Sequence, residues 1–238
     1  MAEDRAPRKA STIVLVRPSD NDGFEIFMTR RPVEMRFLGG FFVFPGGSVK
    51  RGDSSDAMLD RCRGLSPEDA QRQLGDELST AHSMGHWVAA IRELYEEAGI
   101  LLYVTRDGRQ EVDAVVAGRI GSKREDLLSG SLSFPELLQA EDLYCDVGRP
   151  VYFYHRVTPE QYSMRFDTRF YLAVLPAGQV PLASSEEVTE SAWITPGEGL
   201  RRAERGRMAI IPPTLTTLRT LAELGSWDAL CDEFGLPR

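Results

Sequence analysis

The sequence predicts an α/β fold, in which helices pack against a β-sheet. Buried strands are indicated by apolar runs at residues 12–17, 24–29, 150–157 and 164–175. An amphipathic helix is predicted for residues 87–98, because apolar positions recur at helical spacing and Gly99 stands in the usual C-terminal position. Further helices are predicted near the end of the chain, at residues 199–205, 213–224 and 226–234.

The composition is that of an ordinary globular protein. Of its 238 residues, 42% are hydrophobic and 27% are charged, and the formal net charge is −8. An acidic chain of this kind lacks the broad basic surface that binds nucleic acid, and no apolar run approaches the length of a membrane span. We therefore expect neither nucleic acid nor membrane as a partner. A homodimer is left open.

Cysteine usage and the N-terminal segment bear on the compartment. Cys62, Cys145 and Cys231 are widely spaced and form no C-x-x-C motif, which favours a reducing compartment over a disulfide framework or a zinc site. The first ten residues are polar and lack the apolar centre of a signal peptide. These features predict a cytoplasmic protein. Since no repeat or low-complexity linker interrupts the chain, we expect one domain over residues 1–238.

A glutamate-rich stretch lies at the end of the predicted helix, R-E-L-Y-E-E-A-G-I at residues 92–100. At about 100° per residue, Glu93, Glu96 and Glu97 fall within one sector of the helix, opposite the apolar stripe. Carboxylates at these spacings repel each other, and a hard divalent cation such as Mg²⁺ or Mn²⁺ would remove that cost. The alternative is a solvated acidic face.

Upstream of this helix, residues 44–53 form a glycine-rich loop, F-P-G-G-S-V-K-R-G-D. Loop and helix together resemble the Nudix box, in which Gly47 takes the first Gly and Asp53 stands where the first Glu belongs. The second half matches at Arg92, Glu93, Leu94, Glu96, Glu97, Gly99 and Ile100. The chain departs from the box twice, with Asp at position 53 and with 38 residues (54–91) in a gap that is normally seven.

Residues 29–47 carry a second resemblance, to the signature that precedes the box in coenzyme A diphosphatases. The matching positions are Thr29, Arg31, Arg36, Gly40, Phe44, Pro45, Gly46 and Gly47. The resemblance implies that Arg31, Arg36 and Gly40 belong to the substrate site. Arginines on such a loop can hold phosphate groups bidentately, and the alternative is a set of solvated surface arginines.

A third stretch, R-F-D-T-R-F at residues 165–170, resembles the long-insert acyl-coenzyme A diphosphatase branch of the Nudix proteins. It predicts that Arg165, Asp167 or Arg169 faces the ligand. Because these charged residues alternate with packing residues, a solvated strand face is the alternative.

The resemblance implies an α/β/α sandwich with a central mixed sheet and mostly helical insertions at about residues 54–84 and 106–148. It also implies metal-dependent hydrolysis of a diphosphate bond in coenzyme A or acyl-coenzyme A, giving adenosine 3′,5′-bisphosphate and (acyl-)4′-phosphopantetheine. Two alternatives stay open: another nucleoside diphosphate derivative such as NADH or ADP-ribose, and a catalytically silent Nudix ligand-binding module.

Within this scheme the metal ligands are Glu93, Glu96, Glu97 and the carbonyl of Gly46, holding Mg²⁺ or Mn²⁺. Arg92 lies one turn before Glu96 and can orient a carboxylate through a charge-assisted bond. The general base is Glu93 in the box, or Glu187 or Glu190 from a strand expected at residues 186–194.

The segment inside the box is polar, so we expect a surface lid over the site or an inert excursion. A short helix from Ser66 is predicted in it, with Ser as N-cap and Pro at the first position. His82 and His86 lie four residues apart, a spacing that can bind metal, although no Cys or acid completes a set.

Overall fold

The computed structural model describes residues 6–20, 22–75, 77–109, 114–185 and 188–238. The strands are β1 (Arg8–Pro18), β2 (Phe24–Arg30), β3 (Phe42–Val43), β4 (Gly46–Ser48), β5 (Cys62–Arg63), β6 (Tyr103–Val104), β7 (Tyr144–Asp146), β8 (Val151–Val157), β9 (Phe166–Val174) and β10 (Glu190–Ile194). The helices are η1 (Arg51–Ser54), α1 (Asp56–Leu59), α2 (Pro67–Leu74), α3 (Thr80–Ala98), α4 (Ala114–Ser122), α5 (Arg124–Ser129), α6 (Phe134–Ala140), α7 (Pro196–Glu204), α8 (Pro212–Leu224) and α9 (Trp227–Phe234).

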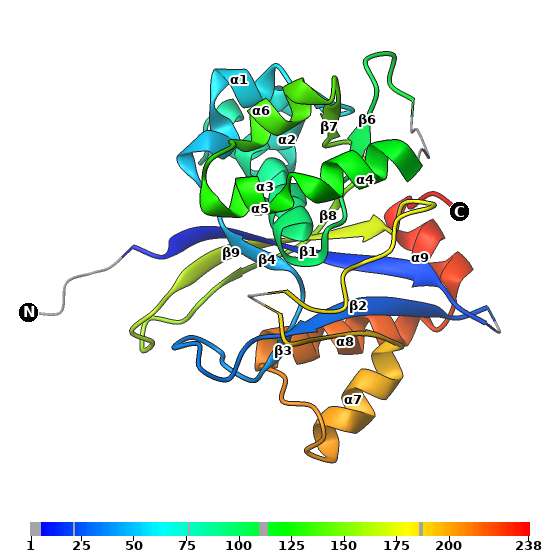
Figure 1. Ribbon diagram of the computed structural model, residues 1–238. Helices are drawn as coiled ribbons and strands as arrows, with labels where there is room; N and C mark the ends of the chain where they lie inside the picture. Colours follow the sequence, from blue (N-terminus) through cyan, green and yellow to red (C-terminus); the bar gives the residue numbers. More distant parts are fainter. Residues whose placement is uncertain (1–5, 21, 76, 110–113, 186–187) are drawn as a thin grey trace, which may run out of the picture.

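A mixed sheet forms the centre of the molecule (Figure 1). Its strand order is β10-β2-β1-β9-β8, with β3 paired to β2 and β4 paired to β1. The two longest strands, β1 and β9, run parallel over nine residue pairs, whereas the other pairs are antiparallel. The mixed sheet that the sequence predicted is therefore confirmed.

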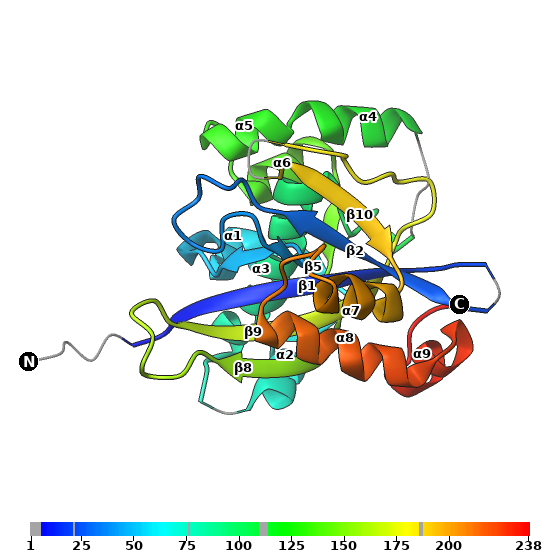
Figure 2. The ribbon, with the colours of Figure 1, turned by 90° about the horizontal axis from the view of Figure 1, so that it is seen from below.

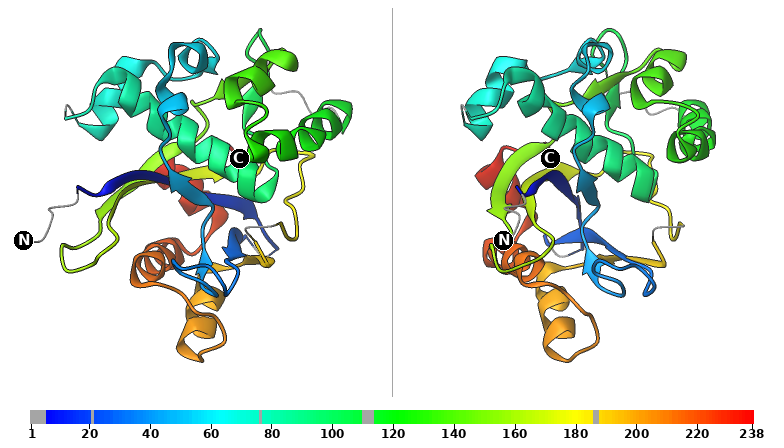
Figure 3. Two further views of the ribbon diagram at one scale, coloured as in Figure 1. Left: turned by 60° about the vertical axis from the view of Figure 1, so that its left-hand side comes forward. Right: turned by 90° about the vertical axis from the view of Figure 1, so that its left-hand side faces the viewer.

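Helices cover both faces of this sheet, which gives three layers. Helices α1 to α6 lie above the sheet in Figure 1 and α7 and α8 lie below it, while α9 packs on the same core as α8. Figure 2 shows α7 and α8 across the lower face, and Figure 3 shows the upper helices gathered around α3. Each face has its own hydrophobic core, with Ile13 and Tyr171 on the α3 side and Val14 and Phe170 on the other. Alternate residues of one strand thus serve different cores.

Helix α3 lies at the middle of the upper layer. The side chain of Ser79 accepts a hydrogen bond from the backbone N–H of His82 at its start, and Gly99 ends it in the left-handed conformation (φ 71°). The helix begins seven residues earlier than predicted. Its apolar side is fully buried, as expected from the pattern, and comprises Trp87, Val88, Ile91, Leu94, Tyr95 and Ala98.

The two insertions pack together above α3. Strand β5 of the first insertion pairs in parallel with β7 of the second, and β7 pairs with β6, the short strand after α3. Met58 and Ala70 are fully buried in the same core as α3, so the first insertion is more than the polar surface segment that we expected. We infer from this shared core that the described residues form one domain.

Within the insertions, α2 begins at Pro67 with Ser66 as its N-cap, as predicted, whereas α1, β5 and β7 were not predicted. The strand expected at residues 186–194 is limited to β10, with residues 186–187 outside the described part. None of the helices in the described part of the chain is long and apolar enough to span a membrane.

Candidate active site

The three glutamates of α3 are buried, and this removes the solvated acidic face as an explanation of the pattern. Glu93, Glu96 and Glu97 are 7%, 9% and 4% exposed. They lie where α3 crosses β4 and η1, which carry the glycine-rich loop of the box. A Cβ atom at Gly47 would lie 2.5 Å from the Glu93 carboxyl carbon. The Glu93 carboxylate, which Arg92 holds, thus occupies the space that a side chain at position 47 would take.

Arg92 connects the two halves of the box. Its Nε and Nη2 donate to the two carboxylate oxygens of Asp53, at 2.7 and 2.9 Å. Its Nη1 donates to Glu93 at 2.6 Å and to both oxygens of Glu96 at 3.1 Å, and Nη2 also reaches the carbonyl of Ser48 at 3.0 Å. The residues at the two ends of the 38-residue gap are thus in direct contact, although the sequence could not fix the path between them.

Burial and the neighbouring charges shift the pKa values of Arg92 and Glu93. Burial opposes the charged form of Arg92, but the hydrogen bonds and charge of Asp53, with the charges of Glu93 and Glu96, raise its pKa. Burial raises the pKa of Glu93, and the repulsion of Glu96 adds to this, while the positive charge of Arg92 opposes it. Arg92 therefore stays protonated, while burial favours the neutral form of the Glu93 carboxyl group.

Lys50 contributes a second positive charge. Its ammonium lies 3.2 and 3.3 Å from the two oxygens of Glu96, and its backbone N–H donates to Asp53 at 2.7 Å. The Lys50 side chain is 58% exposed, in contrast to 3% for Arg92. Sequence reasoning assigned no role to this residue. Its position in the box loop, three residues before Asp53, was the available signal.

The donor set suits a hard divalent ion, since all of it consists of carboxylate and carbonyl oxygens. Gly46, whose carbonyl is the predicted fourth ligand, lies in β4 next to Gly47. As the side chains stand, the described residues contain no group of three or more His, Cys, Asp or Glu arranged around one metal position. Arg92 and Lys50 occupy the oxygens of Glu93 and Glu96, so ion binding requires part of these contacts to open.

The predicted substrate loop runs between β2 and β3. The backbone N–H of Arg31 donates a hydrogen bond to the carbonyl of Phe41, and the carbonyl of Arg31 accepts one from the N–H of Gly40, each at 3.0 Å. These bonds bring Arg31 and Gly40 together at the base of the loop. Gly40 has φ +78°, a conformation that favours glycine. Among the described residues, the buried Nε of Arg31 has no hydrogen-bond partner, whereas Arg36 is exposed. Phe37 packs on Phe166 at a ring distance of 5.1 Å and attaches the loop to the start of β9.

Asp167 and Arg169 lie on the opposite face of β9 from Phe166, on the side of α3. Asp167 is 6% exposed and binds Lys9 at 2.5 Å, His155 at 2.7 Å and Arg169. Arg165 instead donates to the backbone of Thr158 at 3.1 Å. The charged face of β9 is therefore an ion-pair cluster rather than a solvated surface, and its ligand-facing role stays a prediction.

The two histidines do not form a metal pair. His82 is hydrogen-bonded to Ser79, and the buried His86 is hydrogen-bonded to Ser11 at 3.0 Å. The candidate base Glu190 is exposed in β10, with its carboxylate 3.6 Å from Arg30. Glu187 lies outside the described residues. Of the two described candidate bases, Glu93 belongs to the buried carboxylate group and Glu190 does not.

Comparison with known proteins identifies the family. A family model described as the NUDT19 Nudix domain matches residues 7–221, and the chain belongs to this family of Nudix proteins. A nudix hydrolase of Caenorhabditis elegans is 27% identical over 235 residues, covering 96% of this chain and 64% of that protein. The acyl-coenzyme A diphosphatase NUDT19 of Xenopus laevis is 24% identical over 234 residues, covering 85% of this chain and 61% of that protein.

Among solved structures, the chain is similar to a NUDIX hydrolase from Alicyclobacillus acidocaldarius, with a TM-score of 0.74 and 28% identity over 94% of this chain and 95% of that one. The chain thus has the Nudix fold along nearly its whole length. It spans less than two thirds of the curated relatives in the comparison.

Proposed function

We propose that the chain hydrolyses the diphosphate bond of coenzyme A or acyl-coenzyme A in a reaction that depends on Mg²⁺ or Mn²⁺. The observation that carries the proposal is the buried carboxylate group of Glu93, Glu96 and Glu97, held against the glycine-rich loop by Arg92. Burying several carboxylates together costs free energy unless positive charge, such as a bound cation, compensates them. The names of the NUDT19 relatives support coenzyme A as the substrate.

In this proposal Glu93, Glu96, Glu97 and the Gly46 carbonyl hold the ion. When bound there, the ion would supply positive charge to the diphosphate and would lower the pKa of the attacking water. Arg92 fixes Glu93 and Glu96 in position through charge-assisted hydrogen bonds, and Asp53 fixes Arg92 in turn. Glu93, whose pKa is raised mainly by burial, is the proposed acceptor of the proton of the water. Water adds across the P–O–P linkage, so two phosphate monoesters leave.

The substrate is proposed to reach this site from the Arg31 loop. The buried Nε of Arg31 without a protein partner, among the described residues, supports a role in binding an anionic group of coenzyme A. Arg36 is exposed on the same loop and is free to move toward a phosphate. Cytoplasmic location agrees with a coenzyme A substrate and forms part of the proposal.

The test is to identify products by mass spectrometry after incubation with coenzyme A, an acyl-coenzyme A, NADH and ADP-ribose, each with Mg²⁺ or Mn²⁺. Fastest formation of adenosine 3′,5′-bisphosphate and phosphopantetheine supports the proposal. Cleavage of NADH or ADP-ribose but not of coenzyme A would support a Nudix hydrolase activity and contradict coenzyme A as the substrate. Turnover of none would favour the silent binding module. A comparison with 3′-dephospho-coenzyme A shows whether the 3′-phosphate is recognised.

A further inference from the structure

One carboxylate of the site is shared by two cations. Both oxygens of Glu96 accept hydrogen bonds from Arg92, at 3.1 Å, and both also lie within 3.3 Å of the Lys50 ammonium. The Glu96 side chain is 10% exposed, and the Arg92 guanidinium that pairs with it is shared with Asp53 and Glu93.

The two cations are held very differently. Arg92 is buried and is anchored on its far side by two hydrogen bonds to Asp53. Lys50 is mostly in solvent, and its flexible side chain has Glu96 as its charged contact. A divalent ion that approaches Glu96 therefore displaces the ammonium of Lys50 at much lower cost than the guanidinium of Arg92.

The displaced ammonium stays close to the site. The backbone N–H of Lys50 is bound to Asp53 at 2.7 Å, so the residue remains at the beginning of η1 while its side chain swings. Because the Lys50 side chain is 58% exposed, its displaced charge would stay in solvent beside the carboxylates, where it would attract an anionic diphosphate.

We propose that Lys50 is an exchangeable counter-cation of this site: it holds Glu96 while no metal ion is bound, yields it to the ion, and then contacts the diphosphate of the substrate. The second half of this inference rests on the proposed function. The first half concerns ion binding alone and needs no turnover.

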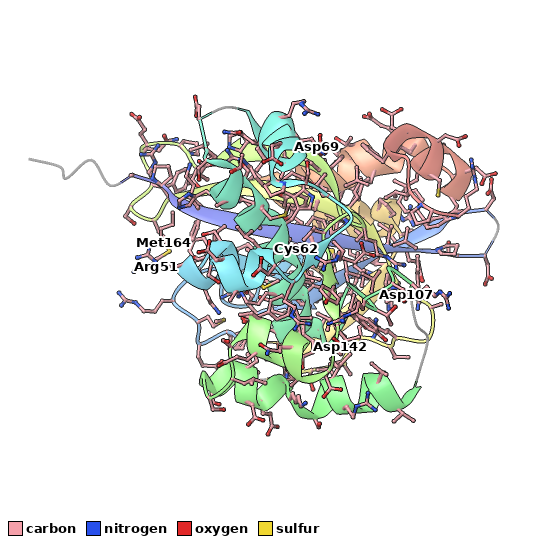
Figure 4. All side chains as sticks on the ribbon, turned by 90° about the horizontal axis from the view of Figure 1, so that it is seen from above. Arg51, Cys62, Asp69, Asp107, Asp142 and Met164 are labelled. Atoms are coloured by element: carbon pink, nitrogen blue, oxygen red, sulfur yellow. The ribbon has the colours of Figure 1, made fainter. Side chains whose placement is uncertain are left out.

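The ion-binding test is a titration of the full chain with Mn²⁺, in which electron paramagnetic resonance measures the concentration of free Mn²⁺. Lys50→Met should bind Mn²⁺ roughly three- to tenfold more tightly than the wild type, since the competing ion pair is lost. Arg51→Met is the matched control, because Arg51 projects from the edge of the molecule and its loss changes the net charge equally (Figure 4). Lys50→Arg keeps a competing cation and should stay near the wild-type affinity. Equal affinities for Lys50→Met and Arg51→Met overturn the inference.

The substrate half is tested at saturating Mn²⁺ with coenzyme A. Lys50→Met should raise KM roughly threefold or more with a smaller change in kcat, and Lys50→Arg should restore KM. An unchanged KM in Lys50→Met removes the contact with the diphosphate, even where the Mn²⁺ result stands. If the wild type hydrolyses no coenzyme A, the proposed function fails, and the Mn²⁺ titration still decides whether Lys50 competes with the ion.

Discussion

Replacement of Arg92 by Met should destabilise the metal-free protein strongly. The Arg92 side chain is 3% exposed and pairs with Asp53, Glu93 and Glu96, each of which is itself at most 10% exposed. Its loss leaves these carboxylates buried without their guanidinium. Breaking a buried ion pair from one side costs about 3–5 kcal/mol. In a domain of this size this corresponds to a fall in Tm of roughly 6–20 °C.

The measurement is urea unfolding at pH 7.5 with EDTA, together with thermal melting. Arg92→Lys should recover only part of the loss, since an ammonium cannot reproduce the fork that binds both oxygens of Asp53. Added Mn²⁺ should restore stability to Arg92→Met in part, because the ion supplies positive charge to the same carboxylates. Arg51→Met is the surface control and should stay within about 0.5 kcal/mol of the wild type. A loss below about 1 kcal/mol in Arg92→Met would show that the carboxylates are neutral or solvated, which refutes the reasoning.

Three further predictions concern single positions. Gly47→Ala places a Cβ 2.5 Å from the Glu93 carboxyl carbon and should reduce kcat/KM at least about tenfold. Gly52→Ala is the control, because a Cβ at Gly52 meets no atom within 4 Å, and it should keep the wild-type kcat/KM. Equal kcat/KM values for the two variants contradict the close contact. Glu97→Gln should lower kcat by orders of magnitude with an unchanged circular dichroism spectrum, and a near-normal rate removes Glu97 from the site. Burial, with the charges of Arg169 and Lys9, lowers the pKa of His86 to about 3. Below pH 6.5 His86 is therefore protonated in the unfolded chain while it stays neutral in the folded chain. The free energy of unfolding therefore has no penalty from His86 above pH 6.5 and falls by up to about 1.4 kcal/mol per pH unit below that pH. His86→Gln should reduce the slope of the urea midpoint against pH, and identical slopes in the variant and the wild type contradict the prediction.

The framework could be predicted from the sequence because its signals are local. The apolar runs fixed β1, β2, β8 and β9, and the helical spacing with Gly99 fixed the end of α3. The short strands β5 and β7 could not be predicted in the same way. Each has two or three residues and exists because it pairs with the other across more than 80 positions of sequence.

The candidate site was predictable in its members and not in its contacts. The spacing of Glu93, Glu96 and Glu97 places them on one side of a helix, but it does not show whether solvent or protein covers them. That depends on β4 and η1, which reach α3 only through the tertiary fold. The same reason explains why Lys50 was missed, because its partner Glu96 lies 46 residues away.

The pairing of β5 with β7 also makes it costly to remove or replace one insertion without the other. If the first insertion alone were removed, β7 would lose a neighbour and expose a strand edge, which is a template for pairing with another chain. Met58 would also leave a gap in the core that the second insertion helps to fill. The two segments are distant in sequence but form one exchangeable module, so we expect relatives to gain, lose or replace them together.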